Sequence, residues 1–178
     1  MTNPILRPCI AALLAAAPAW ALAQTPPIKP GLWEAKSEAS VDGQKTPSPG
    51  ERLQSLPPQV RAQVEASMKQ KGVAIGAGDA SRICFTRESM DPARWGEAAS
   101  CRTEYGTRSN SAWKWHSVCT QPEMTIDGEA IFANPESYRI HTTTTMKRGG
   151  ETKTSERNIQ ARWLGADCGD LKPFDLKR

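Results

Sequence analysis

Two histidines, His116 and His141, are the side chains of this sequence best suited to acid–base chemistry near neutral pH. The sequence contains neither G-x-S-x-G nor H-E-x-x-H, so it lacks common motifs of serine hydrolases and zinc proteases. A hairpin that turns at Asn110 would place Glu104 opposite His116, and a carboxylate can orient an imidazole that acts as a general base. A hydrolase that uses Glu104 and His116 is therefore one hypothesis, with an exposed cross-strand ion pair as the alternative.

The cysteines offer a second kind of chemistry, either redox chemistry or covalent cross-linking. Beyond the N-terminal segment the sequence has four of them, Cys84, Cys101, Cys119 and Cys168. Their separations of 17, 18 and 49 residues differ from the close pairs of a zinc site, and no C-x-x-C motif occurs. In an oxidising compartment they most simply form two disulfides, in one of three possible pairings. We expect no metal and no cofactor.

Residues 1–23 have the pattern of an export signal. Arg7 gives the segment a positive start, the apolar run Cys9–Leu22 follows, and a small-x-small cleavage pattern ends at Ala23. The run is too short to span a membrane comfortably. The pattern predicts cleavage after Ala23 and a mature chain of residues 24–178 that is periplasmic or secreted.

The composition places the mature chain among folded domains. The sequence has 178 residues, 38% of them hydrophobic and 24% charged, with a net charge of +4. It is too apolar for a disordered chain and too polar for a protein that crosses a membrane several times. The charges are dispersed and form no basic stripe, so we expect no nucleic-acid partner. The sequence has no second long apolar stretch, so we expect no transmembrane segment after signal cleavage.

Apolar and polar side chains alternate along seven segments, which is the pattern of half-buried strands. The predicted strands are Gly31–Val41, Ser81–Arg87, Ser100–Thr107, Ala112–Thr120, Glu123–Ala133, Ser137–Lys147 and Glu151–Leu164. Turn residues separate most of them, which favours antiparallel pairing. The predicted fold class is all-β with one helix, in a single domain over residues 24–178, built as a curved antiparallel sheet or partial barrel.

One helix is predicted between the first and second of these strands. Apolar residues recur there at spacings of three and four: Leu53, Leu56, Val60, Val64 and Met68. Pro57 and Pro58 suit the first turn of a helix and Gly72 suits its end, so we expect the helix at about residues 57–71. The apolar stripe predicts that this helix packs on the domain, and binding of a partner is the alternative.

The register of the hairpin that closes at Asn110 favours one pairing of the cysteines. If positions that sum to 220 face each other, Cys101 lies opposite Cys119 and, on the other face, Glu104 lies opposite His116. A slip of one residue would destroy both pairs. The predicted disulfides are therefore Cys101–Cys119 and Cys84–Cys168.

The last two hairpins have registers of their own. Gly149-Gly150 suits a two-residue turn, because glycine tolerates the positive φ that such turns need, and this turn places Ile140 opposite Ile159. In the preceding hairpin Phe132 can lie opposite Tyr138. That register has a competitor, because Asp127-Gly128 is also a turn sequence.

Together these registers place one set of side chains on a shared face of the sheet: Met124, Ile126, Ala130, Phe132, Tyr138, Ile140, Met146, Ile159, Ala161 and Trp163. Toward Gly149-Gly150 the same face becomes polar, with threonines and Arg157. One interpretation is a core whose far end reaches solvent. The other is a concave site with an apolar floor and a polar rim, which suits an elongated amphiphile. The candidate ligand-binding residues are Phe132, Tyr138, Ile140, Trp163 and Arg157.

Several segments resemble a known family. They are Lys29–Glu34 (KPGLWE) after a signal peptide, the helix that begins near Leu56–Gln59 and leads to Cys84, Arg162–Pro173 (RWLGADCGDLKP), and the spaced Cys101 and Cys119. In these features the chain resembles the bacterial family of exported proteins called domain of unknown function 3617. The resemblance implies a small, exported, single-domain protein with structural cysteines, and it brings no catalytic residues to carry over.

The leading hypothesis is an exported, non-enzymatic binding or interaction module of unknown specificity, which holds an apolar or lipid-like molecule, or binds an envelope protein, on its concave face. One alternative is a structural protein that binds partners through the edges of its sheet. The other is the hydrolase that uses Glu104 and His116.

Overall fold

The computed structural model describes residues 25–76, 80–91 and 100–174. The predicted signal peptide, residues 1–23, lies outside these described residues. Within them, no helix combines the length and the apolar character that crossing a membrane requires.

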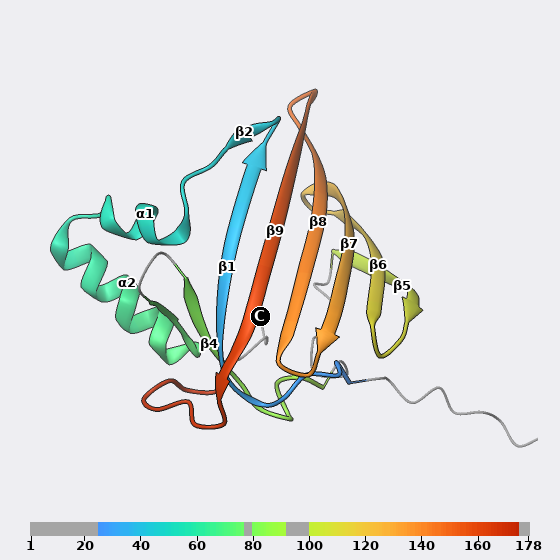
Figure 1. Ribbon diagram of the computed structural model, residues 1–178. Coiled ribbons are helices and arrows are strands. Elements are labelled where there is room, and N and C mark those ends of the chain that lie inside the picture. The colour runs from blue at the N-terminus through green and yellow to red at the C-terminus, as the bar shows by residue number, and fades with distance from the viewer. Residues whose placement is uncertain (1–24, 77–79, 92–99, 175–178) are drawn as a thin grey trace, which may run out of the picture.

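The described residues form one open sheet of antiparallel strands (Figure 1). Its strands are β1 (Gly31–Val41), β2 (Gln44–Lys45), β3 (Val73–Ile75), β4 (Ser81–Phe85), β5 (Cys101–Arg108), β6 (Ala112–Thr120), β7 (Glu123–Asn134), β8 (Ser137–Arg148) and β9 (Glu151–Gly165). Their order is β3-β4-β1-β9-β8-β7-β6-β5, and β2 pairs with β1. The predicted all-β class is confirmed. The two additional strands, β2 and β3, have two and three residues, too few to show an alternating pattern.

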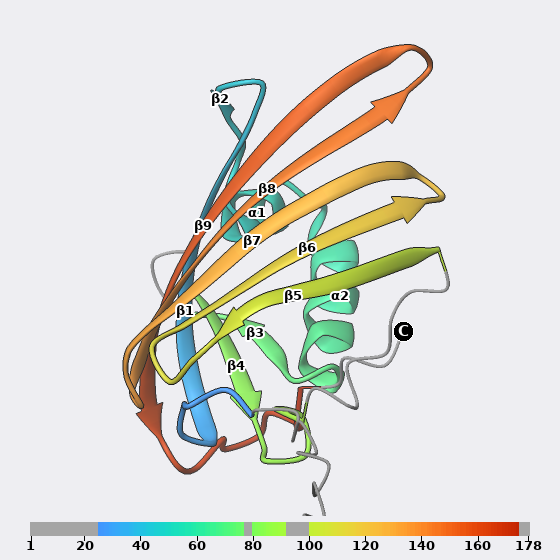
Figure 2. The ribbon, with the colours of Figure 1, turned by 90° about the vertical axis from the view of Figure 1, so that its right-hand side faces the viewer.

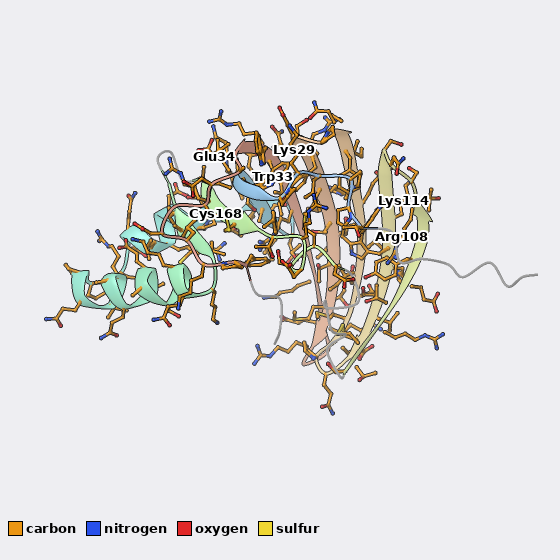
Figure 3. The ribbon with its side chains drawn as sticks, turned by 90° about the horizontal axis from the view of Figure 1, so that it is seen from below. Lys29, Trp33, Glu34, Arg108, Lys114 and Cys168 are labelled. Atoms are coloured by element: carbon orange, nitrogen blue, oxygen red, sulfur yellow. A yellow bond between two sulfur atoms is a disulfide. The ribbon has the colours of Figure 1, made fainter. Side chains whose placement is uncertain are left out.

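The sheet is strongly curved, and both helices lie on its concave side (Figure 2). Seen from below, the strands form an arch, with α2 (Pro58–Gln70) beside its β3 end (Figure 3). The register shifts at Leu32/Trp33, Tyr105/Arg108 and Phe132/Asn134. Such irregularities increase the local twist and bend of a strand, so they contribute to the arch.

The predicted registers are confirmed. Cys101 lies opposite Cys119 between β5 and β6, and Ile140 lies opposite Ile159 between β8 and β9. Gly149 and Gly150 form the β8–β9 turn with φ values of 61° and 85°, which explains why two glycines stand there.

The competing turn at Asp127-Gly128 does not form, because Gly128 lies within β7 opposite Trp115 of β6. The indole of Trp115 lies against the Gly128 backbone, and a Cβ at position 128 would lie only 2.1 Å from indole carbon Cε2. The glycine therefore serves close packing of an aromatic ring at this position, rather than a turn.

The two disulfides join Cys101 to Cys119 and Cys84 to Cys168, the pairing that the hairpin register predicts. The second bond ties β4 to the segment that follows β9. That segment is also held by a hydrogen bond from Phe174 N to Cys84 O and by edge-to-face contact of Phe174 with Phe85. In the chain-entropy model, the loops closed by 18 and 84 residues contribute about 3 and about 4.5 kcal/mol to stability.

The predicted helix exists, but its apolar stripe does not continue along one element. Leu53 belongs to a separate short helix, α1 (Pro49–Gln54), and is buried there. Ser48 and Glu51 form a capping box that starts α1, and Pro57 and Pro58 separate it from α2 because a residue before proline avoids helical geometry. The helix α2 has no buried residue and lies beside β3, so the expected packing of its stripe on the sheet is largely absent.

Replacing Gly128 with alanine should destabilise the protein by roughly 1–3 kcal/mol, because the new methyl group overlaps the Trp115 ring. The matched control is Gly106→Ala in β5, where a Cβ would lie 3.8 Å from its nearest neighbour, Lys114 Cβ. Urea denaturation measures both effects. Equal changes for the two variants would show that the Trp115–Gly128 contact is not a constraint.

Candidate functional site

The curved sheet has two chemically different faces. The concave face, which carries the side chains of the predicted apolar set, is called the inner face. The opposite face is called the outer face. Alternation along the paired strands also assigns to the inner face Trp33, Ala35, Ser37, Ala39 and Val41 of β1, Trp113 and Trp115 of β6, Thr142 and Thr144 of β8, and Lys153, Ser155 and Arg157 of β9. The inner face divides into a lower half, near the β7–β8 turn, and an upper half, near Gly149 and Gly150.

The lower half of the inner face is a filled aromatic core. Trp33 is fully buried, and its ring centroid lies 5.1 Å from that of Tyr138. Phe132 lies between Tyr138 and Trp113, at 6.5 and 5.7 Å from their ring centroids. Two of the predicted ligand-binding residues, Phe132 and Tyr138, are thus only 8% and 7% exposed and belong to the buried core beneath the inner face.

Ile140 and Trp163, two further candidates, are half-buried at the margin of this core. The indole N–H of Trp163 donates to the Pro30 carbonyl at 3.0 Å, and Lys29 Nζ lies 4.8 Å from the centre of its ring. The lead-in segment before β1 therefore contacts this end of the face and accepts the hydrogen bond of the Trp163 indole.

The upper half of the inner face borders a pocket of about 450 Å³. Its lining combines β1, the segment after β2, α1, β8 and β9: Ala39, Ser40, Val41, Thr46, Pro47, Arg52, Thr142, Thr144, Ser155, Glu156 and Arg157. Arg157, the fifth predicted ligand-binding residue, is exposed here, and Thr142 and Thr144 are half-buried. Sequence reasoning identified Arg157 by strand alternation but missed Arg52, because only the folded chain brings α1 over the sheet.

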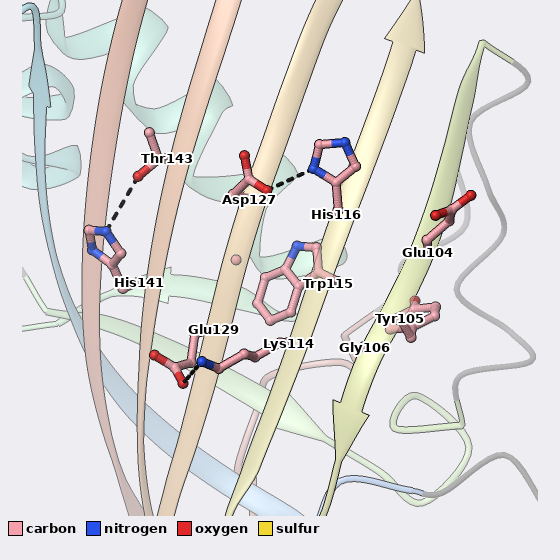
Figure 4. Close-up of a pocket in the computed structure, with 11 residues that line it drawn as sticks. Glu104, Tyr105, Gly106, Lys114, Trp115, His116, Asp127, Glu129, His141 and Thr143 are labelled. Carbon is pink, nitrogen blue, oxygen red and sulfur yellow. Dashed lines mark hydrogen bonds and ion pairs between the residues drawn. The ribbon is translucent and has the colours of Figure 1, made fainter.

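The outer face carries a second, shallow pocket of about 490 Å³ (Figure 4). Its rim is charged and polar: Lys114 Nζ lies 3.2 Å from Glu129 Oε1, and His116 Nδ1 lies 2.7 Å from Asp127 Oδ1. His141 bonds Asn158 through Nδ1 at 2.8 Å. Both histidines thus lie on the face opposite the 450 Å³ pocket.

The predicted opposition of Glu104 and His116 is present in the register, but the two side chains do not bond. His116 has a strand on each side, and it bonds Asp127 of β7 instead of Glu104 of β5. Glu104 pairs with Arg102 at 3.4 Å. The β6–β7 turn at Gln121-Pro122 sets the register that places Asp127 opposite His116. This turn is the feature of the sequence from which the His116–Asp127 pair could have been predicted.

The His116–Asp127 pair has the character of a surface ion pair. Its side chains are 47% and 66% exposed, so water screens their attraction, and such pairs contribute about 1 kcal/mol or less. Among the described residues, no group of three or more His, Cys, Asp or Glu side chains is arranged to hold a metal ion. Near the second disulfide, Asp167 accepts a hydrogen bond from Gly169 N at 2.8 Å, which is the bonding of a closed turn.

Comparison with known proteins gives two matches of interest. The family described as "Protein of unknown function (DUF3617)" matches residues 28–168. A protein of Pseudomonas putida, described as "Uncharacterized protein in lpd-3 5'region", is 31% identical over 112 residues, which are 59% of this chain and 77% of that protein. No solved structure matches the chain.

The buried position of Tyr138 has a measurable consequence. Burial raises the pKa of Tyr138 to about 12, whereas an unfolded tyrosine titrates near about 10. The neutral phenol therefore contributes stability that is fully present below pH about 10 and is lost as the pH rises through about 12.

The sequence has two tyrosines, so the variant Tyr105→Phe leaves Tyr138 as the sole reporter. Ultraviolet absorbance should then show tyrosinate forming only at about pH 12. A reversible midpoint near about 10 in the folded protein would place Tyr138 in contact with water and open the lower half of the inner face.

Proposed function

Since this chain belongs to the family of proteins of unknown function DUF3617, its function has to be inferred from its own surfaces, and we propose an exported, non-enzymatic binding module for an amphiphilic, lipid-like ligand. The ligand lies along the inner face. The observation that carries this proposal is the 450 Å³ pocket at the upper, polar end of that face, where Arg52 and Arg157 are among the lining residues.

The chemistry of the inner face follows the order of an elongated amphiphile. Beyond the aromatic core come Ile140 and Ile159, which are half-buried and pack against it. On the same face, the pair of Thr142 and Arg157 comes next along the strands, and the pair of Thr144 and Ser155 follows it. Ligand pockets typically combine apolar walls with a few polar groups that fix orientation, and the volume here is of the usual size.

The compartment fits this proposal. Two disulfides indicate an oxidising, extracytoplasmic environment, because cytosolic thiols are kept reduced. We place the protein in the periplasm or outside the cell after cleavage behind Ala23, as the N-terminal pattern of Arg7 and the apolar run suggests.

A second candidate function is partner binding through an edge of the sheet. In the described residues β5 has one neighbouring strand, β6, so its other side presents unpaired backbone groups. Edges of this kind can accept an added strand from another protein. A mass in light scattering that rises with concentration, in protein free of ligand, would favour this function over the first.

Mass spectrometry of protein purified from the periplasm tests the proposal. Under denaturing, non-reducing conditions, the mass should correspond to a chain that starts at Gln24 and lacks four hydrogen atoms. Under native conditions, a fraction should carry an added mass that organic extraction removes.

The test can contradict export and lipid binding independently of each other. A chain that retains residues 1–23 would contradict export by cleavage, and free thiols would contradict the disulfides. Native protein that carries no added mass, and takes up none from a mixture of fatty acids and lysophospholipids, would contradict lipid binding.

A further inference from the structure

The cationic end of the 450 Å³ pocket contains binding groups that the protein itself leaves unused. No hydrogen bond or ion pair engages the side chain of Arg157 within the described residues. The hydroxyls of Thr144 and Ser155 on the same face also have no bonding partner among these residues. Arg157 is exposed, and Thr144 and Ser155 are half-buried, so these unused groups are accessible to a ligand.

A second arginine approaches the pocket from the opposite wall and is held in place. Arg52 Nε donates to the Pro47 carbonyl at 2.9 Å, and Nη2 donates to Thr46 Oγ1 at 3.4 Å. A guanidinium has five N–H donors, so these two bonds leave three of the Arg52 donors available. The wall that carries Arg52 is itself fixed, because the Ser48–Glu51 capping box starts α1 just before it.

In the described residues, the neighbouring carboxylates form no ion pair with these two arginines. Glu51 accepts from Ser48 N at 2.6 Å, and hydrogen bonds from Ser48 hold the pKa of Glu51 below its usual value. Asp42 accepts from Thr154 N at 2.9 Å. Glu156 lines the pocket, but alternation along β9 directs its side chain to the outer face. Among the residues that line the pocket there are two arginines, Arg52 and Arg157, and a single carboxylate, Glu156, so the lining has an excess of positive charge. Lys153, on the inner face of β9, adds a further positive charge nearby.

We infer that this pocket binds the anionic head group, a carboxylate or a phosphate, of a single-chain amphiphile. Arg157 and Arg52 hold its oxygens from two sides, and Thr144 and Ser155 complete the contacts. The acyl chain runs down the inner face over Ile140 and Ile159. This inference rests on the proposed function and adds the charge and the orientation of the ligand. Guanidinium pairs well with both anions, since its fork of donors matches their oxygens.

Calorimetric titration below the micellar concentration tests this head-group site. The probes are laurate, lauryl phosphate and uncharged monolaurin, which share one acyl chain. Wild-type protein should bind both anions more tightly than monolaurin, and the tighter of the two identifies the head group. The variant Arg157→Gln should weaken binding of the anions by about 10- to 100-fold, the usual loss of a charge-assisted hydrogen bond. It should leave monolaurin binding within about twofold.

The matched control is Arg139→Gln, which removes the same charge from the outer face of β8. It should bind all three probes like the wild type. A second variant, Thr144→Val, keeps the side-chain shape and should weaken only the anions. Circular dichroism of each variant checks that it is folded.

The outcomes separate this inference from the proposed function. If monolaurin and the anions bind equally well, and Arg157→Gln changes neither, the amphiphile site stands and the anionic head-group site is overturned. The same conclusion holds if Arg139→Gln weakens the anions as much as Arg157→Gln does. If none of the three probes binds, the proposed function itself fails.

Discussion

The antiparallel register that runs from β7 through β8 and β9 to β1 is the constraint on which the inner face depends. Because side chains alternate along a strand, a slip of one residue in any of these ladders would move Trp33 or Tyr138 from the core to the outer face. The same slip would remove Arg157 from the pocket. The fold and the candidate site therefore rest on one set of hydrogen-bonded pairings.

Two kinds of interaction support the sheet around these ladders. Close packing acts within the sheet, where Trp33 meets Tyr138 and the Trp115 ring occupies the space above Gly128. Covalent bonds act near its margins, where Cys101–Cys119 ties β5 to β6 and Cys84–Cys168 ties β4 to the segment after β9. A curved, open sheet with little helical cover benefits from such cross-links, since α2 buries none of its residues against it.

Much of this architecture follows from local patterns in the sequence. Alternation locates the long strands, and the Gly149-Gly150 turn fixes the β8–β9 register, which in turn places Arg157 on the inner face. The features that local patterns do not predict are those that depend on tertiary structure. The apolar spacing from Leu53 onward suggests a single helix, although prolines divide it, and periodicity contains no signal that Arg52 will approach β9. For His116, the β5 register alone could not reveal that a neighbour on β7 competes for its side chain.

The central claim is that the inner face, and not the outer one, receives an amphiphile. Nuclear magnetic resonance with a bound fatty acid tests it most directly through nuclear Overhauser effects, because these report only protons in close contact and so distinguish the two faces of one sheet. We predict contacts between the acyl chain and the side-chain methyl groups of Ile140 and Ile159 on the inner face. Contacts with the imidazole protons of His116 and His141 on the outer face, and none with those methyl groups, would contradict the claim.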